Sequence, residues 1–237
     1  MVSDQYVQRR KLNFEKELNM NKEWSELNKT MQAQIKKKDT YKKGMDTLLR
    51  LRSQLMQTFV SFKEELGRED FNAIPFINAD GYHSKTIAYS IWHIFRIEDI
   101  VANTVIKEDE QVFFSGNYQE RIHSPIITTG NELVKQQIAD FSKQLNLEEL
   151  YSYMFEVRES TEKILECLSY DELKRKIPEE RKRYLESLHV VSDNENAIWL
   201  MDYWCKKDIR GLIQMPFSRH WIMHTEACLR IKIKIHA

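Results

Sequence analysis

Turn-forming residues are scarce in this sequence, and their scarcity limits the folds that it can adopt. The 237 residues include only 6 glycines and 4 prolines. An all-β chain of this length changes direction roughly every 8–12 residues and needs many more turn residues than these. Long helices need few interruptions, and the 42% of residues that are hydrophobic can supply them with a core. The sequence therefore predicts an all-α fold.

Apolar residues recur at helical spacing along most of the chain. In segment 84–107 they lie nearly all round the expected helix, which indicates a central helix buried on several sides. Ser84 is a candidate N-cap for this helix, and Asn146 begins a later one with a pattern similar to a capping box. Pro216 interrupts the chain before a last helix, which Ser218 or the residues just before it could cap. We expect helices over residues 47–66, 84–107, 147–170, 195–209 and 218–235.

Two parts of the chain differ from this core pattern. Residues 1–39 are polar and rich in charge, and we expect them to form an N-terminal helical arm ahead of a helical bundle domain at residues 40–237. Residues 108–130 form a long connection, and connections of that length are often functional or act as lids. This connection could therefore cover a binding site.

The overall charge of the chain is balanced, with 36 basic and 36 acidic residues. Because no overall field would hold a nucleic acid or an anionic membrane, we expect neither as a partner, and a small molecule as substrate. The three cysteines are far apart and form no CxxC motif, which argues against a disulfide framework. No segment has the apolar length of a signal peptide or a membrane span. We expect a cytoplasmic protein.

The segment PFSRHWIMHTEACLR contains two histidines four residues apart. On a helix, His220 and His224 are separated by about 400° of rotation and about 6 Å of rise, so both rings leave the same face one turn apart. Two ring nitrogens can then converge on one point. If the helix begins close to His220, the positive end of its dipole also opposes protonation of that ring.

A metal site needs at least one further ligand, and His93 is the best candidate. It lies in the middle of segment 84–107, where an imidazole without a partner is costly to bury. Three neutral imidazoles suit a divalent transition metal and leave coordination positions open to water or substrate. The alternative is three unrelated structural histidines. The other histidines lie in polar or terminal stretches, and we expect none of them to bind metal: His83, His123, His189 and His236.

Other chemistries have less support in the sequence. It contains no GxSxG motif, glycine-rich phosphate loop, Walker motif or HExxH motif. Carboxylates on the expected helices could orient metal ligands or act as general bases, although surface ion pairing is their commoner role. These carboxylates are Glu98, Asp99, Asp202 and Glu226.

The stretches SIWHIFRIEDIVAN and MPFSRHWIMHTEACLR resemble the DinB/YfiT-like family of metalloenzymes. The pattern of that family is one histidine in the second bundle helix and an HxxxH pair in the last, and it falls here on His93, His220 and His224. The similarity extends over residues 40–235. It implies a four-helix bundle, often dimeric, with nickel or zinc held at one end. In this chain the bundle would carry additional N-terminal and connecting helices.

The resemblance also implies a function. Relatives include transferases and isomerases that use bacillithiol, mycothiol or a similar low-molecular-weight thiol. A metal that binds such a thiol as its thiolate provides a nucleophile at neutral pH. We therefore expect a homodimeric S-transferase that acts on small electrophiles. Arg96, Arg158 and Arg219 are candidates for contacts with the thiol.

The alternative function is a non-catalytic bundle in which the metal is structural or sensory and the basic chain ends bind a partner. A structural zinc ion is normally closed by a fourth protein ligand, whereas a catalytic ion keeps an open position. Cys228 lies four residues after His224 and could be that fourth ligand. The position of Cys228 relative to the three histidines therefore distinguishes a structural metal from a catalytic one.

Overall fold

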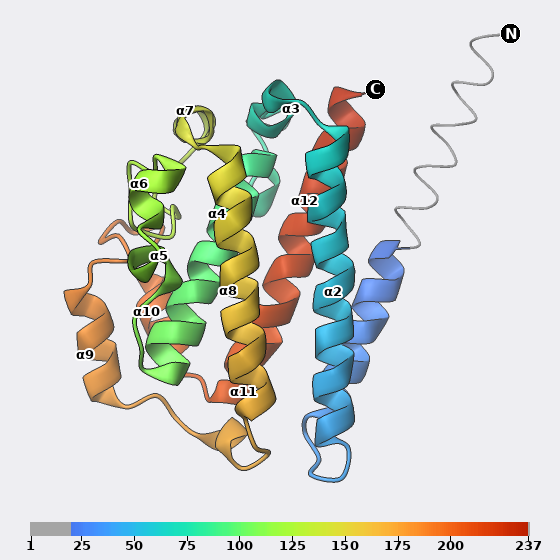
Figure 1. The fold of residues 1–237 in the computed structure, drawn as a ribbon, viewed down its shortest axis with the longest axis vertical. Helices are drawn as coiled ribbons and strands as arrows, with labels where there is room; N and C mark the ends of the chain where they lie inside the picture. Colours follow the sequence, from blue (N-terminus) through green and yellow to red (C-terminus); the bar gives the residue numbers. More distant parts are fainter. Residues whose placement is uncertain (1–19, 237) are drawn as a thin grey trace, which may run out of the picture.

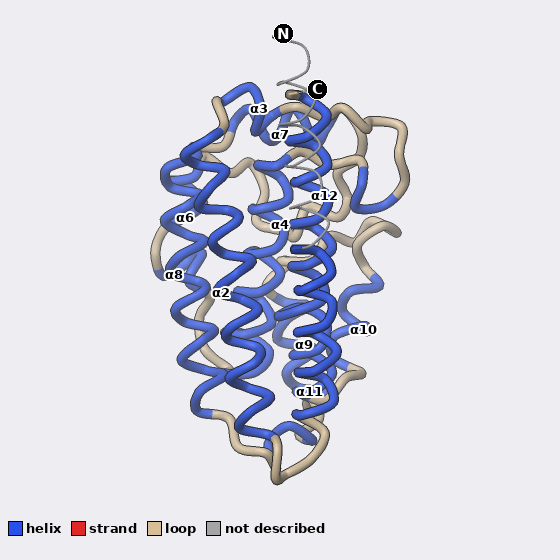
Figure 2. Tube along the Cα trace, turned by 90° about the vertical axis from the view of Figure 1, so that its right-hand side faces the viewer, coloured by secondary structure: helices blue, strands red, loops and turns tan. Residues whose placement is uncertain are grey.

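A computed structural model describes residues 20–236 of the chain, and Figure 1 shows its fold. Every regular element in this range is a helix, and no β-strand occurs in it, as Figure 2 shows. The predicted all-α fold class is confirmed. Residues 1–19 of the expected N-terminal arm lie outside the described residues.

Four long helices form the centre of the fold: α2 (Tyr41–Glu65), α4 (Ile87–Asp99), α8 (Leu147–Cys167) and α12 (His220–Ile235). α4 packs against α8 and α12, and α2 contacts the same two helices. The four therefore lie side by side along the long axis of the molecule (Figures 1 and 2). α4 continues without a break into the π-helical segment η2 (Ile100–Lys107).

Shorter helices connect and cover the long ones. Figure 1 shows α9 and α10 on the far side of α4 and α8 from α2. No helix among the described residues combines the length and the apolar character needed to cross a membrane. The shorter elements are α3 (Arg68–Asn72), η1 (Gly81–His83), α5 (Val112–Ser115), α6 (Tyr118–Ile122), α7 (Gln136–Gln144), η3 (Glu172–Lys174), α9 (Glu179–Ser187), α10 (Trp199–Cys205), α11 (Ile209–Gln214) and η4 (Met215–Arg219).

The described part of the N-terminal arm is helical over residues 20–34 and packs against α2. Glu23 accepts a hydrogen bond of 2.7 Å from the Gln54 side chain. Trp24 and Met31 are buried in the core. The arm thus contributes apolar side chains to the core, and its division from the rest of the chain at residue 40 stays a prediction.

Local capping explains where two long helices begin. Asn146 caps α8, as predicted, because its side chain accepts hydrogen bonds from the backbone N–H groups of Glu148 and Glu149. The predicted cap of α4 is wrong: Thr86, not Ser84, accepts the N–H of the first turn. All 13 residues of α4 are buried. The prediction of a central helix buried on several sides is therefore confirmed.

The last helix ends at Ile235 as predicted, but the extent of the helix expected over 195–209 and the break expected at Pro216 are wrong. Within the expected range 195–209 only α10 is helical before residue 209, and Asp208 accepts the N–H of Gly211 and starts a separate helix, α11, at Ile209. Pro216 does not interrupt the chain, since α11, η4 and α12 follow one another directly. The wide π-helical turn of η4 accommodates the proline. The Ser218 hydroxyl donates to the Ile213 carbonyl at 2.9 Å and caps no helix.

A buried ion pair joins three of the long helices. Arg52 of α2 donates two hydrogen bonds, of 2.9 and 2.7 Å, to Glu98 of α4, and both side chains are fully buried. Trp221 of α12 donates its indole N–H to the same carboxylate at 2.8 Å. Arg52 also donates to the Phe217 carbonyl in η4 at 3.2 Å. This network fixes how α2, α4 and the start of α12 face one another.

We predict that Arg52→Met lowers the free energy of unfolding by about 3–5 kcal/mol, because it leaves the Glu98 carboxylate buried without its cation. Chemical denaturation at pH 7 measures the loss. Arg50→Met is the matched control, since Arg50 is exposed and pairs with Glu23 at the surface. Its loss should cost less than about 1 kcal/mol. Similar small losses in the two variants would contradict the role given to the buried pair.

Candidate metal centre

Three histidines from distant parts of the sequence come together between α4 and α12. Their ring centroids are 4.7–5.0 Å apart, and nitrogen atoms, one from each ring, all lie within 4.8 Å of one another. His93 lies in the middle of α4, and His220 and His224 lie in the first turns of α12. Their exposed fractions are only 4–7%. Among the described residues, no other group of histidine, cysteine or carboxylate side chains has this geometry.

The packing of α4 against α12 produces this arrangement. His220 and His224 share one helix face, so a single partner helix can complete the set. Trp221, next to His220, is hydrogen-bonded to Glu98, which lies five residues after His93 on α4. Trp221 also packs on Phe95, with ring centroids 4.7 Å apart. These contacts hold the two helix faces together at the level of the three rings.

A backbone carbonyl orients His93. Its Nδ1 lies 2.8 Å from the carbonyl oxygen of Thr129. Because a carbonyl can only accept, Nδ1 carries the proton of the neutral ring and Nε2 keeps its lone pair. Metal-binding histidines commonly make such a hydrogen bond with the nitrogen that does not bind the metal. His93 therefore has the orientation and the tautomer that a metal ligand needs.

The other two rings have unsatisfied nitrogens. The Nδ1 atoms of His220 and His224 are buried and have no hydrogen-bond partner among the described residues. Such an atom costs about 1–3 kcal/mol, so two of them in one place call for an explanation. Around a tetrahedral zinc ion, ligand nitrogens lie roughly 3.4 Å apart, which small rotations of these rings would achieve. The three imidazoles fit a divalent transition metal.

Burial keeps the three imidazoles neutral. It lowers the pKa of His93 to about 4, although the hydrogen bond to Thr129 acts in the opposite direction. It lowers the pKa of His220 and His224 well below 6.5, and neighbouring positive charge adds to the effect. The expected contribution of a helix start is wrong, because η4 leads directly into α12 at His220. At pH 7 the lone pairs of the rings are available to a metal.

No fourth protein ligand completes the group among the described residues. Cys228 is buried on α12, but its thiol lies within hydrogen-bonding reach of Ser90 rather than with the three rings. Burial raises the pKa of this thiol to about 12. A thiol with that pKa stays protonated at pH 7, and the thiolate is the form that binds metal. A metal held by the three rings would therefore keep open coordination positions.

The connection over residues 108–130 follows α4 instead of remaining irregular. It contains α5 and α6, and its last residues run along the α4 face that carries His93. Three side chains on successive turns of α4 donate hydrogen bonds to backbone carbonyls of this stretch. Tyr89 donates to the Gly130 carbonyl at 2.8 Å, and His93 donates to the Thr129 carbonyl at 2.8 Å. Arg96 donates to the Ile127 carbonyl at 2.9 Å.

Asp99 holds the other end of the connection. Its carboxylate accepts the backbone N–H groups of Val112 and Phe113, at the start of α5, at 2.9 and 2.8 Å. The Tyr153 hydroxyl also donates to it at 2.9 Å, and Arg96 lies 3.8 Å away. Burial raises the pKa of this carboxyl, whereas these partners lower it. Asp99 thus has a structural role and is not available as a general base.

The other carboxylates named from the sequence also lie outside the group of three rings. Glu98 is occupied by Arg52. Asp202 pairs at the surface with Lys182 and Lys206. Glu226 is half-buried, and burial raises its pKa. The remaining histidines, His83, His123, His189 and His236, lie outside the group as well.

Sequence reasoning missed two tyrosines beside the rings. Tyr89 stacks on His93 with a centroid distance of 5.4 Å and an interplanar angle of 13°. The Tyr82 ring lies 6.0 Å from that of His224. Tyr89 could have been found, because it lies four residues before His93 and so shares its helix face. Tyr82 lies in the short η1 helix and gives no such signal.

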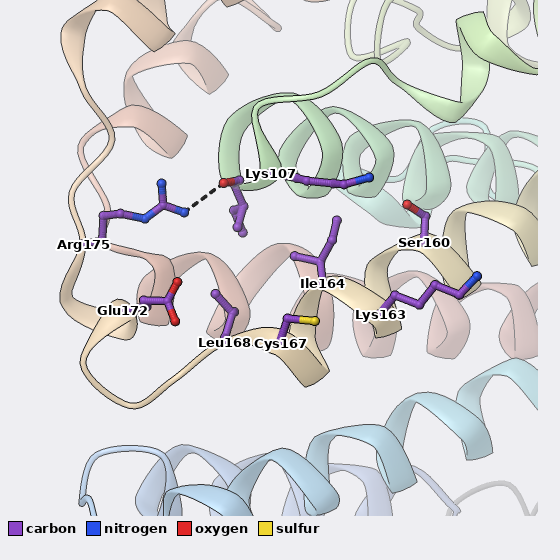
Figure 3. A pocket seen from close by; sticks show the side chains of 9 residues that line it. Lys107, Ser160, Lys163, Ile164, Cys167, Leu168, Glu172 and Arg175 are labelled. Carbon is purple, nitrogen blue, oxygen red and sulfur yellow. Dashed lines mark hydrogen bonds between the residues drawn. The ribbon is translucent and has the colours of Figure 1, made fainter.

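A surface pocket of about 340 Å³ lies away from the three rings, between α8 and η2 (Figure 3). The free thiol of Cys167 is in its wall. Its basic side chains already have partners, so no unpaired charge in it indicates a ligand. The pairs are Lys107 with Asp109, Lys163 with Glu159, and Arg175 with Glu108 and the Ile106 carbonyl.

Comparison with known proteins gives no family assignment. No protein-family model matches the sequence, and no curated protein matches it significantly.

We predict that protein purified without a polyhistidine tag carries about one divalent transition metal per chain, and that His93→Ala and His224→Ala lose it, because two imidazoles bind such an ion much more weakly than three. Elemental analysis of the purified protein measures this. His123→Asn is the control, since His123 is exposed and its φ of +60° suits asparagine. A wild-type protein that takes up neither zinc nor nickel when supplied with both would refute the metal centre.

Metal-free protein should lose stability as the pH falls from about 6.5 towards 4. The unfolded chain protonates its histidines near pH 6.5, whereas burial lowers the pKa of the three rings in the folded chain. Each ring then reduces the free energy of unfolding by up to about 1.4 kcal/mol per pH unit. Urea denaturation at pH 7 and pH 5, with a chelator present, measures the loss. His224→Gln should lose less stability between pH 7 and pH 5 than the wild type, by the contribution of one ring, and His123→Asn should lose as much as the wild type. Equal losses in the wild type and both variants would contradict this prediction.

Proposed function

We propose that this chain is a metal-dependent enzyme that transfers a low-molecular-weight thiol to small electrophiles. His93, His220 and His224 would hold a nickel or zinc ion. The observation that carries the proposal is a group of three buried imidazoles with no fourth protein ligand among the described residues. The resemblance to the DinB/YfiT-like family supports both the ion and the thiol, and the four-helix bundle and homodimer that it implies belong to the same proposal.

The residues around the rings would assist this chemistry. A bound divalent ion supplies a Lewis acid that lowers the pKa of a thiol, so that thiolate is present at neutral pH. The Thr129 carbonyl fixes the ring of His93. Tyr82 and Tyr89 lie against His224 and His93 and limit the access of water. In such an enclosed place, electrostatic effects on a bound thiol are stronger than in water.

The proposed reaction needs no redox cofactor. The thiol gives up its S–H proton to solvent, and its sulfur forms a bond to an electrophilic carbon. The leaving group departs from that carbon with its electron pair, as chloride does from chlorodinitrobenzene. The products are a thioether, the leaving group and a proton, so a thiol and an electrophile are the only substrates.

One observation favours the alternative of a non-catalytic metal. The three rings are only 4–7% exposed, which limits the approach of a substrate. A structural ion would need a fourth ligand, however, and the position of Cys228 beside Ser90 does not supply it. Turnover separates the two functions.

Metal-loaded protein should catalyse the reaction of chlorodinitrobenzene with at least one thiol from a panel that includes bacillithiol and cysteine. The test uses a Cys167→Ser background, because the exposed thiol of Cys167 would react with the electrophile itself. His224→Ala should lose about 100-fold or more of the rate, because it removes a ligand of the ion that activates the thiol. Absorbance of the thioether measures the rate.

Cys228→Ser is the matched control within α12. Its side chain lies outside the group of rings, so the variant should keep both its metal and its rate. A metal-loaded protein with no turnover for any thiol of the panel would support the structural role instead.

A further inference from the structure

A lysine lies close to the three rings. Lys85 is half-buried and lies two residues before the start of α4. Its Nζ is 4.9 Å from the centroid of the Tyr89 ring. The Tyr89 ring in turn stacks on His93, with 5.4 Å between centroids. Lys85, Tyr89 and His93 therefore follow one another at the N-terminal end of α4.

The charge of Lys85 acts on ligands from both helices of the centre. Burial is the main cause of the lowered pKa of His93 on α4 and of His224 on α12, and the charge of Lys85 lowers both further. The chain just before it, η1, packs against α12, and there the Tyr82 ring lies 6.0 Å from that of His224. Lys85 thus lies next to the aromatic ring that stacks on His93, at the end of α4 where η1 packs against α12.

Lys85 has no carboxylate partner among the described residues. Burial lowers its pKa to about 8, and no acidic side chain offsets this effect. The carboxylate that acts on Tyr89 belongs to Glu132, which accepts a hydrogen bond from Thr128 and forms no ion pair with Lys85. By contrast, the buried Arg52 has a carboxylate within 2.7 Å. At pH 7, Lys85 is a mostly protonated and unpaired cation beside the rings.

The centre would therefore have an excess of positive charge when it holds a metal. Three neutral imidazoles leave both charges of a divalent ion uncompensated, and Lys85 adds a third. No described carboxylate belongs to the group. Positive charge removed from water is stabilised by a nearby anion, and an ammonium group forms its strongest hydrogen bonds with anionic oxygens.

We propose that Lys85 binds a carboxylate on the same ligand whose sulfur occupies the open position at the three histidines. The inference rests on the proposed function and adds a property of its substrate: the thiol carries an anionic group near its sulfur. Lys85 determines which thiol binds and takes no part in bond making. This gives the site a chemical preference that the three histidines alone do not have.

The arginines considered from the sequence are less suited to this role. Arg96 is buried and donates to a carbonyl of the connection. Arg158 pairs with Glu162 on its own helix. Arg219 is exposed on the turn before His220. None of the three has the unpaired position beside the rings that Lys85 has.

The test titrates cobalt-loaded full-length protein with two thiols that differ in one group. The probes are 3-mercaptopropionate, which has a carboxylate, and 2-mercaptoethanol, which has none, and the visible spectrum of the cobalt reports binding. We expect the wild type to bind 3-mercaptopropionate about 10-fold more tightly than 2-mercaptoethanol, because one charge-assisted contact is worth about that factor. Lys85→Met should abolish this preference and bind 2-mercaptoethanol as the wild type does.

Two further variants control the test. Lys85→Arg keeps the charge and should keep the preference. Lys143→Met removes an exposed lysine of α7 and should change neither affinity. Equal preference in wild type and Lys85→Met would overturn the inference, even if both proteins bind thiols.

Failure of the proposed function gives a different result. In that case cobalt is bound, but neither thiol changes its spectrum. Acetate then tests Lys85 separately: a spectral change in the wild type that is lost in Lys85→Met supports the anion contact without thiol chemistry. A response to acetate that is the same in both proteins, or absent from both, overturns it, as does a wild type that binds no cobalt.

Discussion

The buried ion pair between Arg52 and Glu98 is the interaction on which the centre of the molecule depends. Two desolvated charges are tolerated only when they are close together and hydrogen-bonded, so α2 and α4 cannot slip past each other by a turn without a large penalty. Trp221 donates a hydrogen bond to Glu98, so the position of α12 is fixed by the same network. Because Glu98 is on the helix of His93 and Trp221 adjoins His220, one polar network also determines how the three imidazoles face one another.

The parts of the fold and of the site that follow from local periodicity could be predicted from the sequence. The shared face of His220 and His224 is a property of any α-helix and needs no knowledge of neighbours. His93 could be added because a segment that is apolar on all sides is a central helix, where an imidazole requires a partner. That partner is in part the Thr129 carbonyl, in a connection whose path the sequence did not indicate.

Features that depend on distant contacts could not be predicted. Local rules predict that Pro216 interrupts the helix, but the π-helical segment η4 contains it and continues into α12. Arg52, which lies 165 residues before Phe217, donates a hydrogen bond to the Phe217 carbonyl in this segment. Serine and threonine are both good N-caps in isolation, so the sequence alone does not choose Thr86 over Ser84. Thr86 is also hydrogen-bonded to the Ser142 hydroxyl, which belongs to α7. Lys85 forms no ion pair with a described carboxylate, and this depends on the three-dimensional arrangement of the chain, which no sequence pattern predicts.

The hydrogen bonds from Tyr89, His93 and Arg96 to the connection restrict substitutions at the donor residues more than at the acceptor residues. Their donors are particular side chains of α4, whereas their acceptors are carbonyls, which every amino acid has. Residues at the acceptor positions can therefore be exchanged while the path of the connection is retained. Gly130 is the exception, because its φ of +75° and the nearby Tyr89 ring disfavour a side chain. Across related chains, the donor side chains on this face of α4 should vary little, and the residues of the connection that supply the acceptor carbonyls should vary freely.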